Sequence, residues 1–402
     1  VVRSESVALD GLMPHETAVI PLDTAVREPL AGASYFVNVT VSLAGKKLGQ
    51  KQFALGKPLA ARPFEAPNEK PLVTLSNGRI TVVGKTFAVQ FENGVITHYE
   101  SGGETLIDAP MRFNFWRAPT DNDGIFGLAG RHIDEWNSRY LSHFECFARK
   151  TEVTETENAV CVTVHGKCQP FSHYVGFDTE IRYTVYADGT IKTDTHMTPF
   201  GNFCATLPRI GVVFTLNKPF RKAAWYGRGP EQSYPDSVLG RSIGFYAADI
   251  ADMNFLFDVP QETGNHENTR FVTIKEETGC GFSVIGSDEF AFSFHPFSLE
   301  NLTAARHKNE LIESDRNYLY IDYKMRGLGS FSCGPEPEEA FELRPHEFRF
   351  VFTLSPQTDA ASVLSLARRD FGSKTAKLTD SYTYVPLAEK TKREVADCSF
   401  EE

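Results

Sequence analysis

Alternation of apolar and polar residues with a period of two runs through the middle of the sequence, and it constrains the fold more than any other feature. Phe87, Val89 and Phe91 alternate with polar neighbours, and Asn93-Gly94 then supplies a hairpin turn. Similar runs occur at 160–164, 181–185, 212–216, 318–324 and 348–352. This period is typical of strands in an antiparallel sheet. We therefore predict an all-β fold with a large antiparallel β-sandwich over residues 72–355.

The flanking segments differ from this central region. Residues 1–58 hold short apolar runs at 18–20, 35–41 and 51–55, which predict a partial immunoglobulin-like β-sandwich because a complete one needs about 100 residues. Residues 59–71 contain three prolines and predict a linker. Residues 356–402 predict a short helix, N-capped by Thr358, followed by a polar tail. A second short helix is expected at 131–140.

Charge and hydropathy exclude two classes of partner. The formal net charge is -11, and the sequence has no basic footprint of the kind that nucleic-acid binding requires. No apolar run approaches the roughly 20 residues needed to span a bilayer. We therefore expect neither a nucleic-acid nor a membrane partner.

The seven cysteines are odd in number and scattered, without a Cys-x-x-Cys pair. This pattern argues against a zinc site and against a disulfide framework. It favours free thiols in a reducing compartment, so we predict a cytoplasmic protein with no bound metal.

Four glycine- and proline-rich segments carry the candidate site residues. They are 115–123 (FWRAPTDND), 225–237 (WYGRGPEQSYPDS), 260–266 (PQETGNH) and 327–335 (GLGSFSCGP). In the first, Asp121, Asn122 and Asp123 offer a polar site for a sugar hydroxyl or a cation. The alternative is a turn in which these side chains cap their own backbone, and the pattern after Pro119 favours the turn. In the second, Trp225 ends an apolar stretch, which favours a place in the core over a sugar-stacking role.

The four segments together resemble the carboxyl-terminal region of family 2 β-galactosidases. They occur in the family's order, and Leu207-Pro208-Arg209-Ile210-Gly211 fits between the first two. The resemblance implies a β-supersandwich similar to galactose mutarotases, preceded by the end of an immunoglobulin-like domain. It also implies a retaining enzyme that hydrolyses terminal β-D-galactosides. The family's catalytic glutamates and its magnesium ion lie on a (β/α)8 barrel, and no alternation of strands and helices in this sequence corresponds to that barrel.

The resemblance therefore implies that this chain holds no catalytic residue and no cofactor, and that it is inactive alone. Its partner would be the catalytic barrel domain or a large subunit of the same enzyme, with a β-galactoside as substrate; a homo-oligomer is compatible with the family. Some members send a tryptophan from the Gly-x-Gly loop to the sugar pocket. Cys333 stands near that position here, so we expect Phe331, Ser332 and Cys333 at the pocket rim.

Two other functions are open on the sequence alone. A stand-alone carbohydrate-binding module would bind galactosides without the barrel. A mutarotase-like epimerase would need a positioned acid and base, for which His266, His295 and His307 are the candidates.

Overall fold

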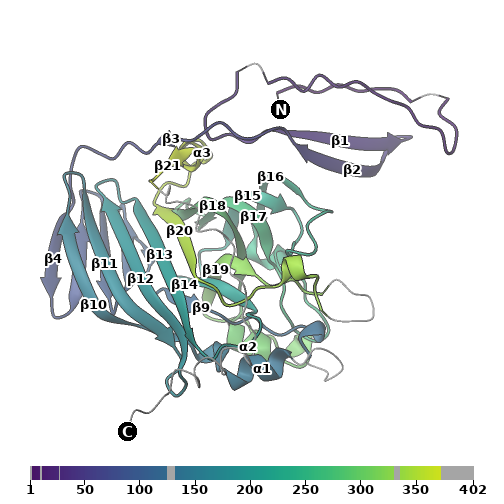
Figure 1. The fold of residues 1–402 in the computed structure, drawn as a ribbon. Coiled ribbons are helices and arrows are strands. Elements are labelled where there is room, and N and C mark those ends of the chain that lie inside the picture. The colour runs from purple at the N-terminus through teal and green to yellow at the C-terminus, as the bar shows by residue number, and fades with distance from the viewer. Residues whose placement is uncertain (1, 10, 27, 125–131, 330–335, 373–402) are drawn as a thin grey trace, which may run out of the picture. The chain divides into compact units, whose positions relative to one another are not determined.

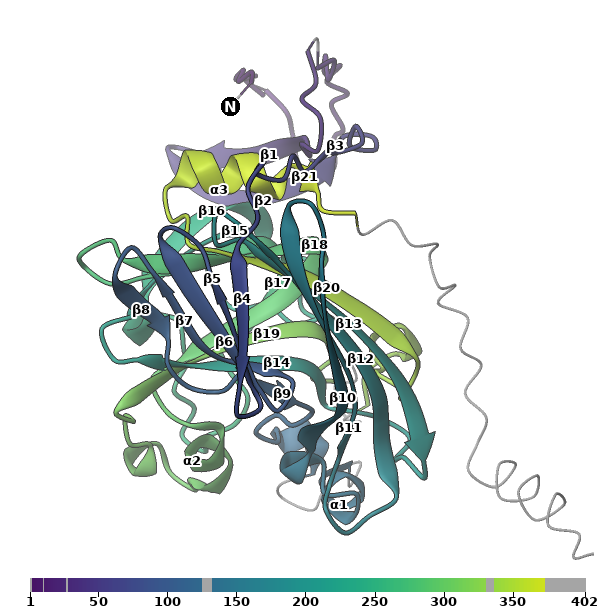
Figure 2. The same cartoon turned by 90° about the vertical axis from the view of Figure 1, so that its left-hand side faces the viewer.

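The computed structural model describes residues 2–9, 11–26, 28–124, 132–329 and 336–372 (Figures 1 and 2). The chain divides into an amino-terminal unit, residues 1–63, and a carboxyl-terminal unit, residues 64–402. The division falls inside the predicted linker 59–71. Each unit is described by itself below.

The amino-terminal unit contains one β-hairpin. Strand β1 (Phe36–Leu43) pairs antiparallel with β2 (Lys46–Ala54). The short strand β3 (Arg62–Pro63) is the last element of the unit in sequence. Ala44 and Gly45, between the two strands, both have positive φ, as a tight hairpin turn requires. The apolar run 18–20 is not a strand, so the expectation of one there was wrong. The three residues are exposed, without the pairing partner that a strand needs. The immunoglobulin-like assignment stays a prediction.

The carboxyl-terminal unit is built from two antiparallel sheets. Among its described residues, five strands form the smaller sheet, in the order β4-β5-β6-β7-β8. Their bounds are β4 (Leu72–Ser76), β5 (Arg79–Val83), β6 (Phe87–Glu92), β7 (Val95–Ser101) and β8 (Glu104–Ile107).

The larger sheet contains twelve of the described strands. Its main path is β10-β11-β12-β13-β20-β18-β17-β15-β16, while β14 pairs with β9 and β19, and β19 also pairs with β18. The bounds are β9 (Arg112–Asn114), β10 (Glu145–Glu155), β11 (Ala159–Gln169), β12 (Val175–Tyr186), β13 (Ile191–Gly201), β14 (Arg209–Asn217), β15 (Lys222–Gly229), β16 (Ser242–Asp249), β17 (His266–Lys275), β18 (Gly281–His295), β19 (Arg316–Met325) and β20 (Phe348–Ser355). The predicted all-β fold is confirmed, and each alternating run lies on a strand.

A continuous hydrophobic core joins the two sheets. Val82 and Phe91 from the smaller sheet pack in the same cluster as Val162 and Tyr183 from the larger one. The buried Tyr183 hydroxyl donates to the Gly94 carbonyl at 3.1 Å. Because a buried hydroxyl without a partner is costly, this bond fixes the smaller sheet's β6–β7 turn against the larger sheet.

The described part of this unit also contains three α-helices, one short strand and five 3-10 helices. The α-helices and the strand are α1 (His132–Ser138), α2 (Leu299–Ala304), α3 (Ala360–Ala367) and β21 (Arg369–Asp370), and each 3-10 helix is a single turn of three residues. Both predicted helices are therefore confirmed. The cap of α3 was predicted wrongly: Asp359, not Thr358, accepts from the Ser362 amide at 2.9 Å. A carboxylate also interacts favourably with the positive end of the helix. Helices α1 and α2 lie at one end of the unit and α3 at the other (Figure 1).

Two of the cysteines correct the expectation of free thiols throughout. Cys146 on β10 stands opposite Cys168 on β11, and a disulfide joins them. The sequence gives no spacing cue for this pair, because it arises from strand register. Among the described residues, Cys161, Cys204 and Cys280 are free. The predicted compartment, which depended on free thiols, stays a prediction.

Candidate functional site

The four motif segments meet at the end of the carboxyl-terminal unit that carries α1 and α2. The Asn122 amide donates to the Leu328 carbonyl at 2.9 Å, which joins the first segment to the fourth. The second and fourth are joined by the Gly329 amide, which donates to the Asp236 carboxylate at 2.8 Å. The third meets the first where the Glu262 amide donates to the Ala118 carbonyl at 3.2 Å. We call this meeting point, residues 115–123, 232–236, 260–266 and 326–329, the motif junction.

A buried ion pair forms the centre of the motif junction. Arg117 and Asp123 are both fully buried, and their side chains make two hydrogen bonds, of 2.7 and 3.1 Å. Arg117 also donates to the Arg326 carbonyl at 2.6 Å. Arg326 is buried as well and pairs with Glu342 at 2.8 Å. Because a buried charge must be compensated, these pairs hold the first and fourth segments in one arrangement.

Close packing against two side chains explains one of the glycines in the fourth segment. A Cβ atom added at Gly327 would stand 2.7 Å from the Asp236 carboxylate and 3.0 Å from the Phe341 Cβ. Gly329 has a φ of 125°, which side-chain-bearing residues rarely adopt. Both features restrict the path of the chain leading toward residue 330.

The chain is anchored again just after residue 335. The Glu336 carboxylate lies 2.8 Å from Arg326 Nη2 and 2.8 Å from Nε2 of His132, the first residue of α1. The two flanks of segment 330–335 are thus both tied to the motif junction, through Gly329 on one side and Glu336 on the other.

A second group of buried charges centres on Arg209 of β14. Its guanidinium lies 3.0 Å from Asp322 on β19 and 3.8 Å from Glu262 of the third segment. Burial raises the pKa of Asp322 to about 7 in spite of this neighbour. Burial also lowers the pKa of His295, and the positive charge of Arg209 lowers it further in the same direction, to about 3. At neutral pH the histidine is therefore uncharged.

Comparison with known proteins identifies the family. Residues 83–354 match the family described as beta galactosidase small chain. This chain belongs to the β-galactosidase small-chain family. The β-galactosidase of Actinobacillus pleuropneumoniae is 29% identical over 355 residues, which are 85% of this chain and 34% of that protein. That of Staphylococcus xylosus is 32% identical over 318 residues, 77% of this chain and 31% of that protein.

The small-chain member described here thus spans about a third of the length of these relatives. Among solved structures, a galactose 1-epimerase from Lactobacillus acidophilus NCFM covers 80% of this chain and 98% of its own, at 8% identity and a TM-score of 0.38.

The predicted polar residues of this small chain contact other parts of the protein. Asp123 accepts from the Thr120 amide at 2.9 Å as well as from Arg117, and Asn122 donates to Leu328. Asp121 is exposed and bonds to the Gln261 amide at 3.3 Å. The turn that the sequence favoured is therefore present, and its side chains link three segments. Whether they also bind a sugar stays a prediction.

The other candidates fall into three groups. Phe331, Ser332 and Cys333 lie outside the described residues. Trp225 is buried, as predicted, and its indole nitrogen donates to the Arg228 carbonyl at 2.9 Å. His307 is exposed.

Two of the histidines proposed as an epimerase acid or base are enclosed by protein. His266 and His295 are buried, and burial lowers the pKa of His266 to about 4. A catalytic acid or base has to reach its substrate. The burial of these two side chains therefore disfavours an epimerase.

Sequence reasoning missed Arg326, Arg209 and Asp322 as parts of the site. One sequence signal could have indicated them. A charged residue on a strand that is apolar on both faces will be buried, and a buried charge needs a partner of opposite charge. Asp322 fits this description within the run Tyr320, Ile321, Asp322.

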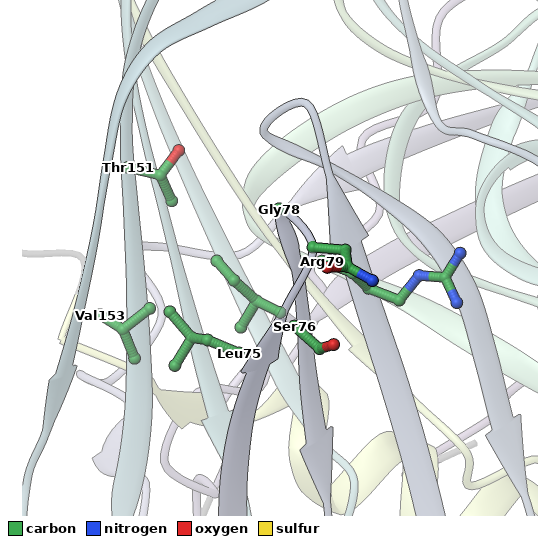
Figure 3. A pocket seen from close by; sticks show the side chains of 8 residues that line it. Leu75, Ser76, Gly78, Arg79, Thr151 and Val153 are labelled. Atoms are coloured by element: carbon green, nitrogen blue, oxygen red, sulfur yellow. The ribbon is translucent and has the colours of Figure 1, made fainter.

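A pocket is lined by residues outside the motif junction. It has a volume of about 320 Å³ and is lined by the β4–β5 turn and by Thr151 and Val153 of β10 (Figure 3). Its charged lining residue, Arg79, pairs with Glu92 at 2.6 Å. The described residues that line it include no carboxylate, so this pocket has no pair of acids for glycoside hydrolysis.

The described residues form neither a metal-binding cluster nor a membrane-spanning helix. No group of three or more histidine, cysteine, aspartate or glutamate side chains there is arranged to hold a metal ion. In the same part of the chain, every helix is too short or too polar to cross a membrane.

Proposed function

We propose that the chain is the non-catalytic carboxyl-terminal part of a retaining β-galactosidase, in which it supports the catalytic barrel and holds segment 330–335 at the rim of the sugar pocket. The complete enzyme would hydrolyse terminal β-D-galactosides. The match to the small-chain family over residues 83–354 supports the assignment to such an enzyme.

The observation that carries the proposed role is the anchoring on both sides of segment 330–335. Gly329 and Glu336 are each fixed by charged side chains of the motif junction. Such anchors are expected where a loop must present side chains to a ligand in one geometry, because ordering the loop in advance lowers the entropic cost of binding.

The proposal assigns chemistry to the barrel and positioning to this chain. A retaining glycosidase needs two carboxyl groups about 5 to 5.5 Å apart and open to the sugar. The carboxyl groups enclosed at the motif junction, Asp123 and Glu262, are buried and engaged by arginines. We therefore propose that the acid/base and the nucleophile belong to the barrel.

The test is a matched pair of glycine variants in the complete β-galactosidase. Gly327→Ala places a Cβ atom 2.7 Å from the Asp236 carboxylate that accepts from the Gly329 amide, so either the carboxylate or the fourth segment must shift. Gly240→Ala adds a methyl group with nothing within 4 Å. We expect Gly327→Ala to raise KM for lactose about tenfold, equivalent to about 1.4 kcal/mol of lost binding, with a smaller change in kcat. Gly240→Ala should behave like the wild-type enzyme. Unchanged kinetics in a folded Gly327→Ala enzyme would contradict the positioning role.

A further inference from the structure

A cross-strand pair of cysteines lies outside the motif junction and has no part in the function proposed above. Cys146 and Cys168 face each other in the antiparallel ladder of β10 and β11 and are joined as a disulfide. Cys168 is fully buried in the core, whereas Cys146 is partly exposed. Among the described strands, β10 lies at one edge of the larger sheet. One sulfur of the pair is therefore near solvent, and the other is protected.

The pair ties down a weak end of the ladder. A shift in register between Ala148 and Lys150 interrupts the pairing of β10 with β11. Beyond this bulge only residues 145–148 of β10 remain paired with β11. Bulges disrupt the hydrogen bonding of a ladder, and short terminal pieces open most easily. The disulfide lies within this piece and holds it covalently.

The tethered piece leads directly to the motif junction. Phe144, the residue before β10, packs on Phe115 with ring centres 5.0 Å apart. Helix α1 lies a few residues earlier, and its His132 contacts Glu336. Forming or breaking the disulfide therefore changes how firmly the start of β10, the strand that follows α1 in the sequence, is held.

The described free thiols are poorly placed to exchange with this disulfide. Burial raises the pKa of Cys204 to about 12, which suppresses its thiolate. Cys161 is also on β11, seven residues before Cys168. At about 3.3 Å per residue along a strand, the two cysteines are roughly 23 Å apart. Burial also raises the pKa of Cys280. None of the three free thiols in the described part of the chain is therefore a favoured exchange partner, and a thiol from solution remains as the co-reactant.

We propose that Cys146 and Cys168 form a reversible thiol–disulfide modification site, whose co-reactant is a low-molecular-weight thiol and its disulfide. In the oxidising direction the Cys146 thiolate attacks one sulfur of the small disulfide and expels a thiolate, which takes up a proton. The Cys168 thiolate then attacks the Cys146 sulfur of the mixed disulfide and expels the second small thiolate, which is protonated in turn. Two protein S–H bonds and one small-molecule S–S bond are lost. One protein S–S bond and two small thiols form, with two electrons passing to the small molecule.

The test uses the 402-residue chain and glutathione as the probe. The folded protein is equilibrated in buffers that range from fully reduced to fully oxidised glutathione, quenched in acid and alkylated, and each cysteine peptide is weighed by mass spectrometry. As the buffer becomes more oxidising, we expect the alkylated forms of Cys146 and Cys168 to be replaced by a peptide pair joined through a Cys146–Cys168 disulfide. Cys161 and Cys280 should stay alkylated or carry only single glutathione adducts. Cys161→Ser should give the same transition.

Hydrogen exchange supplies the second readout. We expect amides of residues 145–148 to exchange about tenfold faster after reduction, because only the short ladder then holds them. The variant Cys146→Ser should exchange at the reduced rate in every buffer. Three results would each overturn the proposal. In the first, Cys146 and Cys168 stay thiols in fully oxidised glutathione. In the second, they stay bonded in folded protein under full reduction, and in the third, the amides of residues 145–148 exchange at the same rate in both states. None of these results depends on galactosidase activity, so the failure of this proposal and of the proposed function are distinguishable.

Discussion

Replacing Asp123 by alanine removes the central anion of the motif junction. The buried carboxylate accepts two hydrogen bonds from Arg117, at 2.7 and 3.1 Å, and one from the Thr120 amide at 2.9 Å. It also lies 3.4 Å from Arg326. Breaking a buried pair by deleting one partner costs about 3 to 5 kcal/mol, because the other charge stays buried. Arg326 keeps Glu342, so the loss falls mainly on Arg117. We expect Asp123→Ala to lower the free energy of unfolding by about 4 kcal/mol.

The assay is equilibrium unfolding in urea followed by tryptophan fluorescence. The three tryptophans, Trp116, Trp136 and Trp225, are all buried in the carboxyl-terminal unit, so the signal reports on that unit. The matched control is Asp121→Ala in the same turn. Asp121 is exposed, and its loss should change stability by no more than about 0.5 kcal/mol. A folded Asp123→Ala protein within about 1 kcal/mol of wild type would refute the reasoning about buried charge.

Three other results are expected. Asp322 keeps its proton up to about pH 7 in the folded chain but releases it near pH 4 when unfolded, so the folded state binds more protons between these values. The free energy of unfolding of the wild type, relative to Asp322→Asn, should therefore fall by at most about 4 kcal/mol as pH rises from about 4 to about 7. Unfolding curves measured across that range check this, and a difference between the two proteins that does not change with pH would contradict a raised pKa of Asp322. Tyr183→Phe should lose about 1 kcal/mol in the same assay through its bond to Gly94, and a neutral effect would show that the bond is unimportant. Calorimetric titration of the chain alone with galactose should give no binding heat at millimolar sugar, whereas a saturable signal would favour a carbohydrate-binding module.

The strands were predictable because alternation with a period of two directly reports burial on one face. Phe87, Val89 and Phe91 occupy β6, and the Asn93-Gly94 turn follows with positive φ at both residues. Helix α1 was predictable from Ile133 and Trp136 on one face. The run 18–20 failed because apolar residues predict a strand only where a neighbouring strand can pair with them.

The site was predictable in its parts but not in its assembly. The four segments were recognisable from glycine, proline and carboxamide residues, yet nothing local indicates that Asn122 bonds to Leu328, 206 residues away. The partners Arg326 and Asp322 lie on or beside strands, where only tertiary pairing reveals them. Cys146 and Cys168 are likewise brought together by register, which a spacing rule cannot detect.

The measurement that tests the central claim most directly is hydrolysis of a chromogenic β-galactoside by the purified 402-residue chain, produced in a host without β-galactosidase. We predict no release of chromophore above the buffer rate at any concentration of the chain, because the proposed function assigns loop positioning to this chain and the chemistry to a separate barrel. Turnover that rises in proportion to the amount of chain, and that co-elutes with it on gel filtration, would contradict the account.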